Sequence, residues 1–172
     1  MNQARIPTVA VVARSGTGKT TLIEAVIREL RSRGHRVGAL KHDAHDFEID
    51  RPGKDSARFT AAGAEVMVLA SDRKVAMVRR TVVPEKLDNM VQKWFDGMDI
   101  VIVEGYKTSD LPKIEVHRPE LGQPLLSRGE KHDPHLLAVA STGTPEVDVP
   151  VLDADDPAAV ADFLEEVVLG TP

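Results

Sequence analysis

The apolar residues of this chain fall into two patterns, short unbroken runs and helical stripes. Residues 8–13 (TVAVVA) form a Val-rich apolar run, which is typical of a strand buried on both faces of a parallel sheet. Residues 20–33 carry apolar side chains on one helical stripe and charged side chains opposite, and Gly34 ends this stretch. Residues 36–40 (RVGAL) predict a second strand. This part of the chain therefore predicts a strand, helix and strand with a right-handed crossover.

The rest of the chain predicts further short elements separated by loops. A hairpin is expected from two apolar runs, residues 65–70 and 74–78, on either side of a turn at Asp72 and Arg73. Further strands are predicted at residues 99–104, 113–117, 136–140 and 149–152. Helices are predicted at residues 56–62, 84–95 with Pro84 at the first position, and 156–169 with Asp155 or Asp156 as N-cap. The stretches 41–55 and 119–134 are predicted to be long connections.

Composition and charge narrow the classes of protein that fit. A chain of 172 residues with 42% hydrophobic and 28% charged residues predicts one globular domain spanning residues 1–172. Lys and Arg number 22 against 27 Asp and Glu, a net charge of −5, which argues against nucleic acid as a partner. Cysteine is absent, so disulfides, thiol nucleophiles and iron–sulfur clusters are excluded, and we expect a reducing, cytoplasmic location. No apolar run reaches the length of about 18 residues that a membrane span needs, and we expect neither a span nor a signal peptide.

The segment ARSGTGKT, residues 13–20, is close to a phosphate-binding P-loop. It stands directly after a predicted strand and directly before a predicted helix, which is the context that this motif requires. Backbone N–H groups of such a loop surround a phosphate, the lysine reaches the terminal phosphate oxygens, and the next hydroxyl binds Mg²⁺. The predicted phosphate-binding residues are Ser15, Gly16, Thr17, Gly18, Lys19, Thr20 and Thr21, with Thr20 also on the metal. The first glycine of the consensus is replaced by Ala13, the smallest substitute with a side chain.

Glu104 is a candidate magnesium carboxylate. It ends the apolar run DIVIVE, and the carboxyl ends of parallel strands meet at the edge of the sheet where ligands bind. A P-loop protein needs such an acid at the end of a neighbouring strand. The alternative is a strand end that only faces solvent. These elements together predict an α/β fold of the P-loop NTPase type, with three layers, a mostly parallel central sheet and helices on both faces.

The segment KHDAHDFEID, residues 41–50, leaves several interpretations open. His42 and His45 with nearby carboxylates could bind a transition metal. The segment could instead be a switch that senses the γ-phosphate and magnesium through Asp43 or Asp50, and Asp50 is a further candidate magnesium ligand. It could also be a solvated loop. Four cations of this region could contact a second anionic ligand or remain solvated: Lys41, Arg51, Lys54 and Arg58. His35, His117, His132 and His135 are expected at the surface.

Three blocks of the sequence resemble one family, the molybdopterin-guanine dinucleotide biosynthesis protein B (MobB) family. They are the loop SGTGKTTL, the segment 38–64 with KHDAHDFEID and PGKDS, and DIVIVEGYK followed by PKIEV. In this resemblance residues 16–21 match the phosphate loop and Glu104 matches the acid of EGYK. Ala13 departs from the family's glycine.

The resemblance implies a GTP-binding accessory protein with weak, Mg²⁺-dependent GTPase activity. Such a protein assists its partner, the guanylyltransferase called protein A, which attaches GMP to molybdopterin. A homodimer is the expected assembly, and molybdopterin itself is a further candidate partner. The sequence contains no NKxD motif for reading guanine, and the segment AVAST at 138–142 stands where a base could lie. The catalytic group is unknown, and Arg14 is a conceivable arginine finger.

Two other classes of function fit part of the same pattern. An ATP-dependent small-molecule kinase would use the same loop and place its acceptor near residues 41–58. A metal-insertion chaperone would use His42 and His45, although the chain lacks cysteine and a His-rich tail. Nucleotide preference separates the first alternative from GTP-dependent function, and metal titration separates the second.

Overall fold

The computed structural model describes residues 5–43, 47–129 and 132–171. The chain divides into two compact units: the first comprises residues up to 42 and from 90 onward, and the second comprises residues 43–89. The single domain expected from the sequence stays a prediction. In the part of the chain that the structure describes, no helix is long and apolar enough to cross a membrane.

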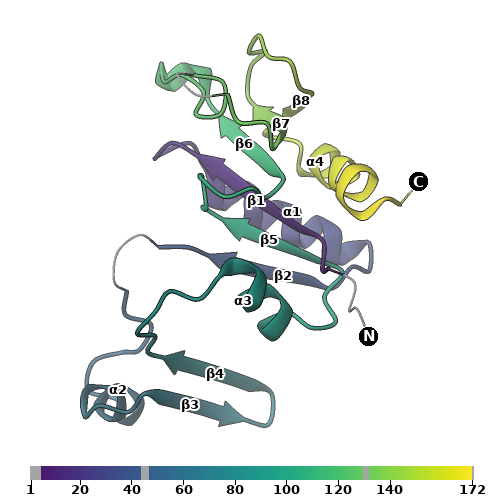
Figure 1. The fold of residues 1–172 in the computed structure, drawn as a ribbon. Coiled ribbons are helices and arrows are strands. Elements are labelled where there is room, and N and C mark those ends of the chain that lie inside the picture. The colour runs from purple at the N-terminus through teal and green to yellow at the C-terminus, as the bar shows by residue number, and fades with distance from the viewer. Residues whose placement is uncertain (1–4, 44–46, 130–131, 172) are drawn as a thin grey trace. The chain divides into compact units, whose positions relative to one another are not determined.

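The first unit is built on a six-stranded sheet in which every strand pair is parallel. The strand order is β2-β5-β1-β6-β7-β8, so β1 lies between β5 and β6 (Figure 1). The strands are β1 (Thr8–Ala13), β2 (Val37–Lys41), β5 (Ile100–Glu104), β6 (Lys113–His117), β7 (Leu136–Ser141) and β8 (Val151–Asp153). The predicted α/β architecture with a mostly parallel sheet is confirmed. The last strand lies one to two residues later than predicted.

Helices cover both faces of this sheet, as the sequence predicted. α1 (Lys19–Ser32) and α4 (Pro157–Leu164) lie on one face, and the part of α3 (Leu87–Trp94) that belongs to this unit lies on the other (Figure 1). The core between α1, α4 and the sheet includes Leu30 and Leu164, which are fully buried. The first four residues of β1 pair with β5 and the last four pair with β6, so the strand has a neighbour on each side. Burial of its Val side chains follows from that central position.

The predicted C-terminal helix is confirmed at its beginning. Asp156 is the N-cap, and its carboxylate accepts hydrogen bonds from the backbone N–H groups of Ala158 (3.0 Å) and Ala159 (3.1 Å). The helix continues into a π-helical turn at Glu165–Leu169 and ends at Gly170, whose φ is 67°. A left-handed residue of this kind terminates a helix, and glycine adopts that conformation without strain.

A close approach explains the glycine in β2. A Cβ on Gly38 would stand 2.4 Å from the ring of Phe95, which follows α3. Only glycine allows this ring to pack directly on the strand. The contact joins the end of α3 to the sheet.

β6 packs Ile114 and Val116 of one face into the core, and its other face carries charged side chains that are also buried, Lys113 and Glu115. The Lys113 ammonium lies 3.0 Å from the Asp133 carboxylate, and Glu115 accepts hydrogen bonds from the N–H groups of Leu126 (2.6 Å) and Ser127 (2.9 Å). Desolvation raises the pKa of Asp133, but the hydrogen bond from a backbone N–H and the Lys113 ammonium outweigh it, so this pKa lies below its usual value. These interactions hold the connection between β6 and β7 over the strand.

In the described part of the second unit, the chain forms one short helix and a hairpin. They are α2 (Asp55–Ala61), β3 (Val66–Ser71) and β4 (Lys74–Arg79), and the two strands pair antiparallel with the turn at the predicted position. Met67 is the only buried residue of this unit within the described ranges. Large apolar side chains are exposed instead: Phe47, Ile49, Phe59, Val66, Val68, Leu69, Val75, Val82 and Val83.

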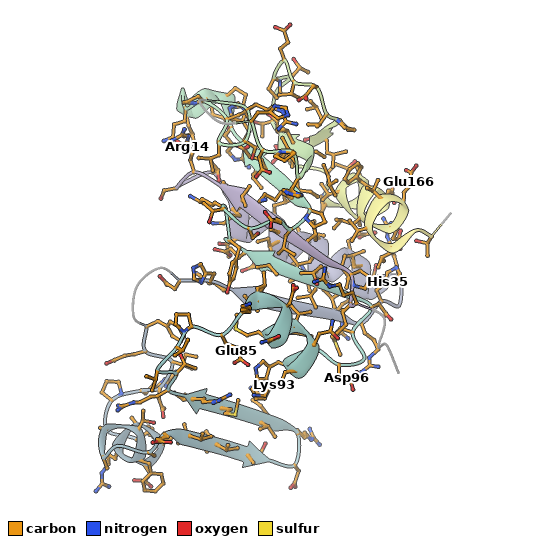
Figure 2. All side chains as sticks on the ribbon, in the orientation of Figure 1. Arg14, His35, Glu85, Lys93, Asp96 and Glu166 are labelled. Atoms are coloured by element: carbon orange, nitrogen blue, oxygen red, sulfur yellow. The ribbon has the colours of Figure 1, made fainter. Side chains whose placement is uncertain are left out.

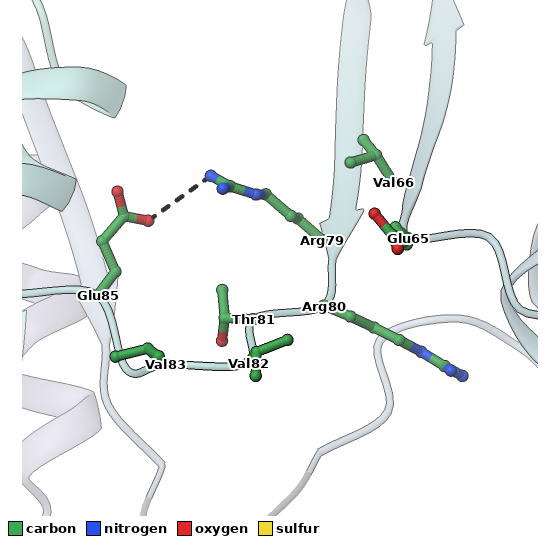
Figure 3. Close-up of a pocket in the computed structure, with 8 residues that line it drawn as sticks. All are labelled: Glu65, Val66, Arg79, Arg80, Thr81, Val82, Val83 and Glu85. Atoms are coloured by element: carbon green, nitrogen blue, oxygen red, sulfur yellow. Dashed lines mark ion pairs between the residues drawn. The ribbon is translucent and has the colours of Figure 1, made fainter.

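The helix expected from Pro84 begins later, at Leu87. Residues 81–86 remain outside the helix, and Glu85 points toward Arg79 of β4, with its carboxylate 3.9 Å from the guanidinium (Figure 3). A helix that began at Pro84 would have Val83 as its N-cap, and valine has no side-chain oxygen that could accept a hydrogen bond from the first N–H groups. The prediction of Pro84 as the first helical residue is therefore wrong.

Candidate functional site

The loop between β1 and α1 has the backbone geometry of an anion site. Gly16 and Gly18 have φ values of 82° and 79°, which glycine adopts without strain. Gly18 is the N-cap of α1 and supplies no side chain, so no side-chain hydrogen bond closes the start of the helix. The first N–H groups of an uncapped helix attract a negative ligand. Ser15 and Thr21, the flanking residues of the predicted set, are exposed.

Ala13 does not distort this loop. It is 2% exposed at the end of β1, and Tyr106 is the only non-glycine residue with a positive φ among those that the structure describes. Ala13 therefore has an ordinary backbone conformation, as its Cβ requires.

Thr17 and Arg14 stabilise the loop itself. Thr17 is 5% exposed, and its hydroxyl donates to the carbonyl of Arg14 at 3.1 Å. The Arg14 guanidinium donates through Nε to the carbonyl of Pro124 at 2.7 Å. Figure 2 labels Arg14 at the carboxyl end of β1 and His35 near the opposite end of the sheet. Two of the predicted loop residues thus have structural hydrogen bonds of their own.

Glu104 lies at the centre of the charged residues around the loop. Its Oε1 is 3.3 Å from Nζ of Lys19 and 3.8 Å from Nζ of Lys41, and its Oε2 accepts a hydrogen bond from the Thr20 hydroxyl at 3.2 Å. The Glu104 side chain is 15% exposed. Three elements bring these groups together: α1 carries Lys19 and Thr20, β2 ends at Lys41, and β5 ends at Glu104.

The oxygens of Thr20 and Glu104 are of the kind that Mg²⁺ prefers. Magnesium binds through one or two protein oxygens, several waters and the phosphates of a nucleotide. The hydroxyl and carboxylate are adjacent and partly open to solvent, so they fit this role. Within residues 5–43, 47–129 and 132–171, no three His, Asp or Glu side chains form a group that could hold a metal without such a ligand.

His42 contacts the residues beyond β5. The centroid of its ring lies 4.3 Å from that of the Tyr106 ring. The backbone N–H of His42 donates to the backbone carbonyl of Glu104 at 3.0 Å. Tyr106 has a φ of 53°, which is unusual for a bulky residue. Backbone conformations of this kind are enriched at functional sites. Burial raises the pKa of the Tyr106 hydroxyl. His45 and Asp46 lie outside the described residues, so the metal-binding interpretation of His42 stays a prediction.

Asp50 and the cations near it belong to the second unit. Asp50 Oδ1 accepts the N–H of Arg51 at 2.8 Å, and Oδ2 is buried without a hydrogen-bond partner among the described residues. Arg58 pairs with Asp55 of its own helix at 3.3 Å. The role of Asp50 as a metal ligand stays a prediction.

Three of the four histidines expected at the surface are only partly exposed. His35 lies 2.6 Å from the Glu165 carboxylate. His117 Nε2 lies 3.1 Å from the carbonyl of Gln123, and its Nδ1 is buried without a partner in the described chain. His132 is exposed and His135 is partly exposed. None of the four histidines is buried in the core, so the structure is consistent with the surface prediction.

Arg118 is a neighbour of the loop that sequence reasoning missed. Its Nε donates to the carbonyl of Thr17 at 2.9 Å, and its guanidinium lies 3.5 Å from the position of a Cβ on Gly18. The residue directly follows β6, the strand beside β1, and that place could have indicated it. The AVAST segment also reaches this edge, because β7 ends at Ser141 and Thr142 donates to Glu120 at 2.9 Å.

An open hollow of about 440 Å³ lies in the second unit, away from the loop residues in sequence. Figure 3 shows it between the ends of the hairpin and the segment that follows. Its lining combines apolar and charged side chains: Glu65, Val66, Arg79, Arg80, Thr81, Val82, Val83 and Glu85. None of the predicted phosphate-binding residues lines it.

The sequence pattern of one family, described as molybdopterin guanine dinucleotide synthesis protein B, matches residues 8–142. The chain belongs to the MobB family. Two curated relatives named molybdopterin-guanine dinucleotide biosynthesis adapter protein are 39% identical to it. The one from Haemophilus influenzae aligns over 94% of this chain and 89% of its own length, and the one from Escherichia coli over 94% and 93%. The crystal structure of Bacillus subtilis MobB is similar with a TM-score of 0.73 and 28% identity, covering 93% of this chain and 97% of that one. The MobB resemblance seen in the sequence is thereby confirmed, as is the P-loop NTPase architecture.

Proposed function

We propose that this MobB-family chain is a GTP-binding adapter in the formation of molybdopterin guanine dinucleotide. The observation that carries the proposal is the convergence of Lys19, Thr20 and Glu104 beside an uncapped helix start. Relatives named as adapters in this biosynthesis support the assignment of the pathway.

The residues of the loop would hold the phosphates of GTP. Backbone N–H groups of residues 15–20 and the Lys19 ammonium supply positive charge, and Thr20 with Glu104 would hold Mg²⁺. Bound magnesium neutralises part of the phosphate charge. Glu104 pairs with Lys19 and Thr20, so both of these side chains lie close to the positions proposed for them. Binding then requires Lys19 to exchange a carboxylate for phosphate oxygens.

Hydrolysis by this site is proposed to be slow. A fast GTPase needs a group that orients water and a cation that stabilises the charge of the transition state. Arg14, the conceivable arginine finger, has its Nε engaged with the carbonyl of Pro124. An adapter that binds GTP and turns it over slowly is consistent with this arrangement.

A homodimer is proposed on the basis of the second unit. A two-stranded hairpin is marginally stable in water on its own. The exposed apolar side chains of β3 and β4 provide a surface that a second copy of the chain could cover, as do the outer edges of these strands, which pair with no other strand that the structure describes. The guanylyltransferase of the pathway is the proposed second partner, with molybdopterin as a further candidate and the cytoplasm as the expected location.

A reconstituted assay tests the adapter function. Purified guanylyltransferase is given molybdopterin and GTP, and dinucleotide formation is followed with and without this chain. We expect the wild-type chain to increase the rate and Lys19→Ala to lose most of that increase, because Lys19 supplies the fixed side-chain cation of the loop. Arg31→Ala removes an exposed cation at the far end of the same helix and should behave as wild type. Equal stimulation by Lys19→Ala and wild type would contradict the proposal.

The magnesium assignment is tested separately by Glu104→Gln. This change keeps the shape of the side chain and removes its charge. We expect the dependence of GTP binding on Mg²⁺ to weaken more than the affinity measured without Mg²⁺. An unchanged magnesium dependence would show that Glu104 is only a strand end.

A further inference from the structure

The direction of a bound nucleotide follows from the place of Glu104. This inference rests on the proposed GTP binding. Glu104 ends β5, on one side of β1, so the metal and the terminal phosphates belong on that side of the loop. The nucleoside must then extend toward the other side, where the carboxyl ends of β6, β7 and β8 lie. Ligands of open parallel sheets bind along this edge.

Arg118 connects the loop to that region. Its Nε is bonded to the Thr17 carbonyl, and its two terminal nitrogens lie 3.4 Å from carboxylate oxygens of Glu120 and Asp155. The side chain is 29% exposed, so part of it remains accessible to a ligand. A planar guanidinium also packs well on the face of an aromatic ring. Arg118 thus fixes the position of the Glu120 carboxylate relative to the loop.

Glu120 is held at the end of two strands. It lies in a short 3-10 helix, Pro119–Leu121, that follows β6, and it accepts the hydroxyl of Thr142, which follows β7, at 2.9 Å. A hydrogen bond from its own backbone N–H, with that from Thr142, keeps the pKa of Glu120 below its usual value, so the side chain is ionised at neutral pH. The side chain is 55% exposed. A carboxylate has about four acceptor sites, so further N–H groups can bind.

We propose that Glu120 reads the guanine base of the nucleotide and that Arg118 positions it. Guanine presents two neighbouring donors, N1–H and the 2-amino group, which a carboxylate can accept together. Adenine presents an acceptor at N1 and no 2-amino group, so the same carboxylate rejects it. The pair provides a guanine reader in a chain whose sequence contains no NKxD motif.

The change Glu120→Gln gives a test with a gain of binding. Xanthine keeps N1–H and has a carbonyl in place of the 2-amino group, so an amide can accept from the first and donate to the second. Binding of GTP, ITP, XTP and ATP is measured by calorimetry with Mg²⁺. We expect wild type to prefer GTP, and ITP, which lacks one donor, to bind at least about tenfold more weakly. Glu120→Gln should lose at least about tenfold in GTP affinity and should prefer XTP.

Glu146→Gln is the matched control, because Glu146 is an exposed carboxylate in the loop after β7. This variant should keep the wild-type order of affinities. A Glu120→Gln protein that still prefers GTP would overturn the inference and leave the proposed GTP binding intact. Equal weakening of all four nucleotides would also overturn it, since Glu120 would then act only on the loop through Arg118. A wild-type chain that binds no nucleotide would overturn the proposed function itself.

Discussion

β1 and β3 are both six-residue, Val-rich strands, yet their side chains lie in opposite environments. β1 pairs on both sides, and residues 9–13 are at most 6% exposed. Among the strands that the structure describes, β3 pairs with β4 alone. Met67 is the one buried residue of β3, while Val68 is 54% exposed. The first unit closes a core within one chain, and the second does not. Similar composition therefore leads to different burial because the number of neighbouring strands differs.

The largest expected effect comes from placing a charge in the closed core. Val103 of β5 is fully buried, so Val103→Asp should cost more than about 4 kcal/mol and remove most of the folding free energy. Urea unfolding followed by circular dichroism measures this. Val167→Asp, at a valine that is 47% exposed in the first unit, should change stability by less than about 0.5 kcal/mol. Equal losses in the two variants would contradict the described core.

The buried ion pair between Lys113 of β6 and Asp133 should give a smaller effect that depends on pH. Asp133→Asn leaves the Lys113 ammonium buried without its carboxylate, at a cost of about 3 kcal/mol at pH 7. The pKa of Asp133 is depressed in the folded protein, so the stabilisation is complete above its unfolded value near 3.8 and is lost as the pH falls below it. Unfolding measured at pH 7, 5, 4 and 3 should show the gap between wild type and variant closing in acid. A constant gap would contradict the pair's role.

Charged substitutions in the hairpin should change the oligomeric state of the protein rather than the stability of the first unit. Val68→Asp combined with Leu69→Asp places two charges on side chains that are 54% and 59% exposed. We expect a dimer of the wild-type chain to become monomeric, as measured by sedimentation, because charges oppose burial of this surface. Val167→Asp again serves as control and should leave the assembly unchanged. A dimer that persists in the double variant would place the interface elsewhere.

The smallest effect is expected at the partly exposed ion pairs that Arg33, the C-cap of α1, makes with residues in and directly after α4. Arg33 lies 2.5 Å from Asp162 and 2.6 Å from Glu165, and the hydrogen bonds with these two carboxylates raise its pKa. Arg33→Met should lower stability by less than about 1 kcal/mol, since solvent screens such pairs. The loss should shrink further in high salt. Urea unfolding at low and high salt checks this, and a loss as large as that of Asp133→Asn would be inconsistent with screening.

The sequence predicted the fold best where a pattern was local. The apolar run of β1, the glycines before Lys19, and Asp156 before Pro157 are local signals, and each element formed where expected. The proximity of Glu104 to Thr20 was also predicted. Glu104 ends one parallel strand, and Thr20 follows the loop after the neighbouring one, so both lie at the same edge of the sheet.

What the sequence did not predict depends on distant segments. The alternation of Lys113 and Glu115 along β6 is typical of a strand with one solvated face, yet residues 126, 127 and 133 of the next connection bury that face. The contact of Arg118 with Thr17 likewise joins residues 101 positions apart. Such contacts follow from strand order, which a single sequence does not specify.

Calorimetric titration of GTP and ATP into wild type and Lys19→Ala, each with and without Mg²⁺, tests the central claim that the loop beside Glu104 binds GTP. The account predicts GTP binding by wild type that is stronger than ATP binding and strengthened by Mg²⁺, and no measurable binding by Lys19→Ala. Equal GTP affinity in the two proteins would contradict it.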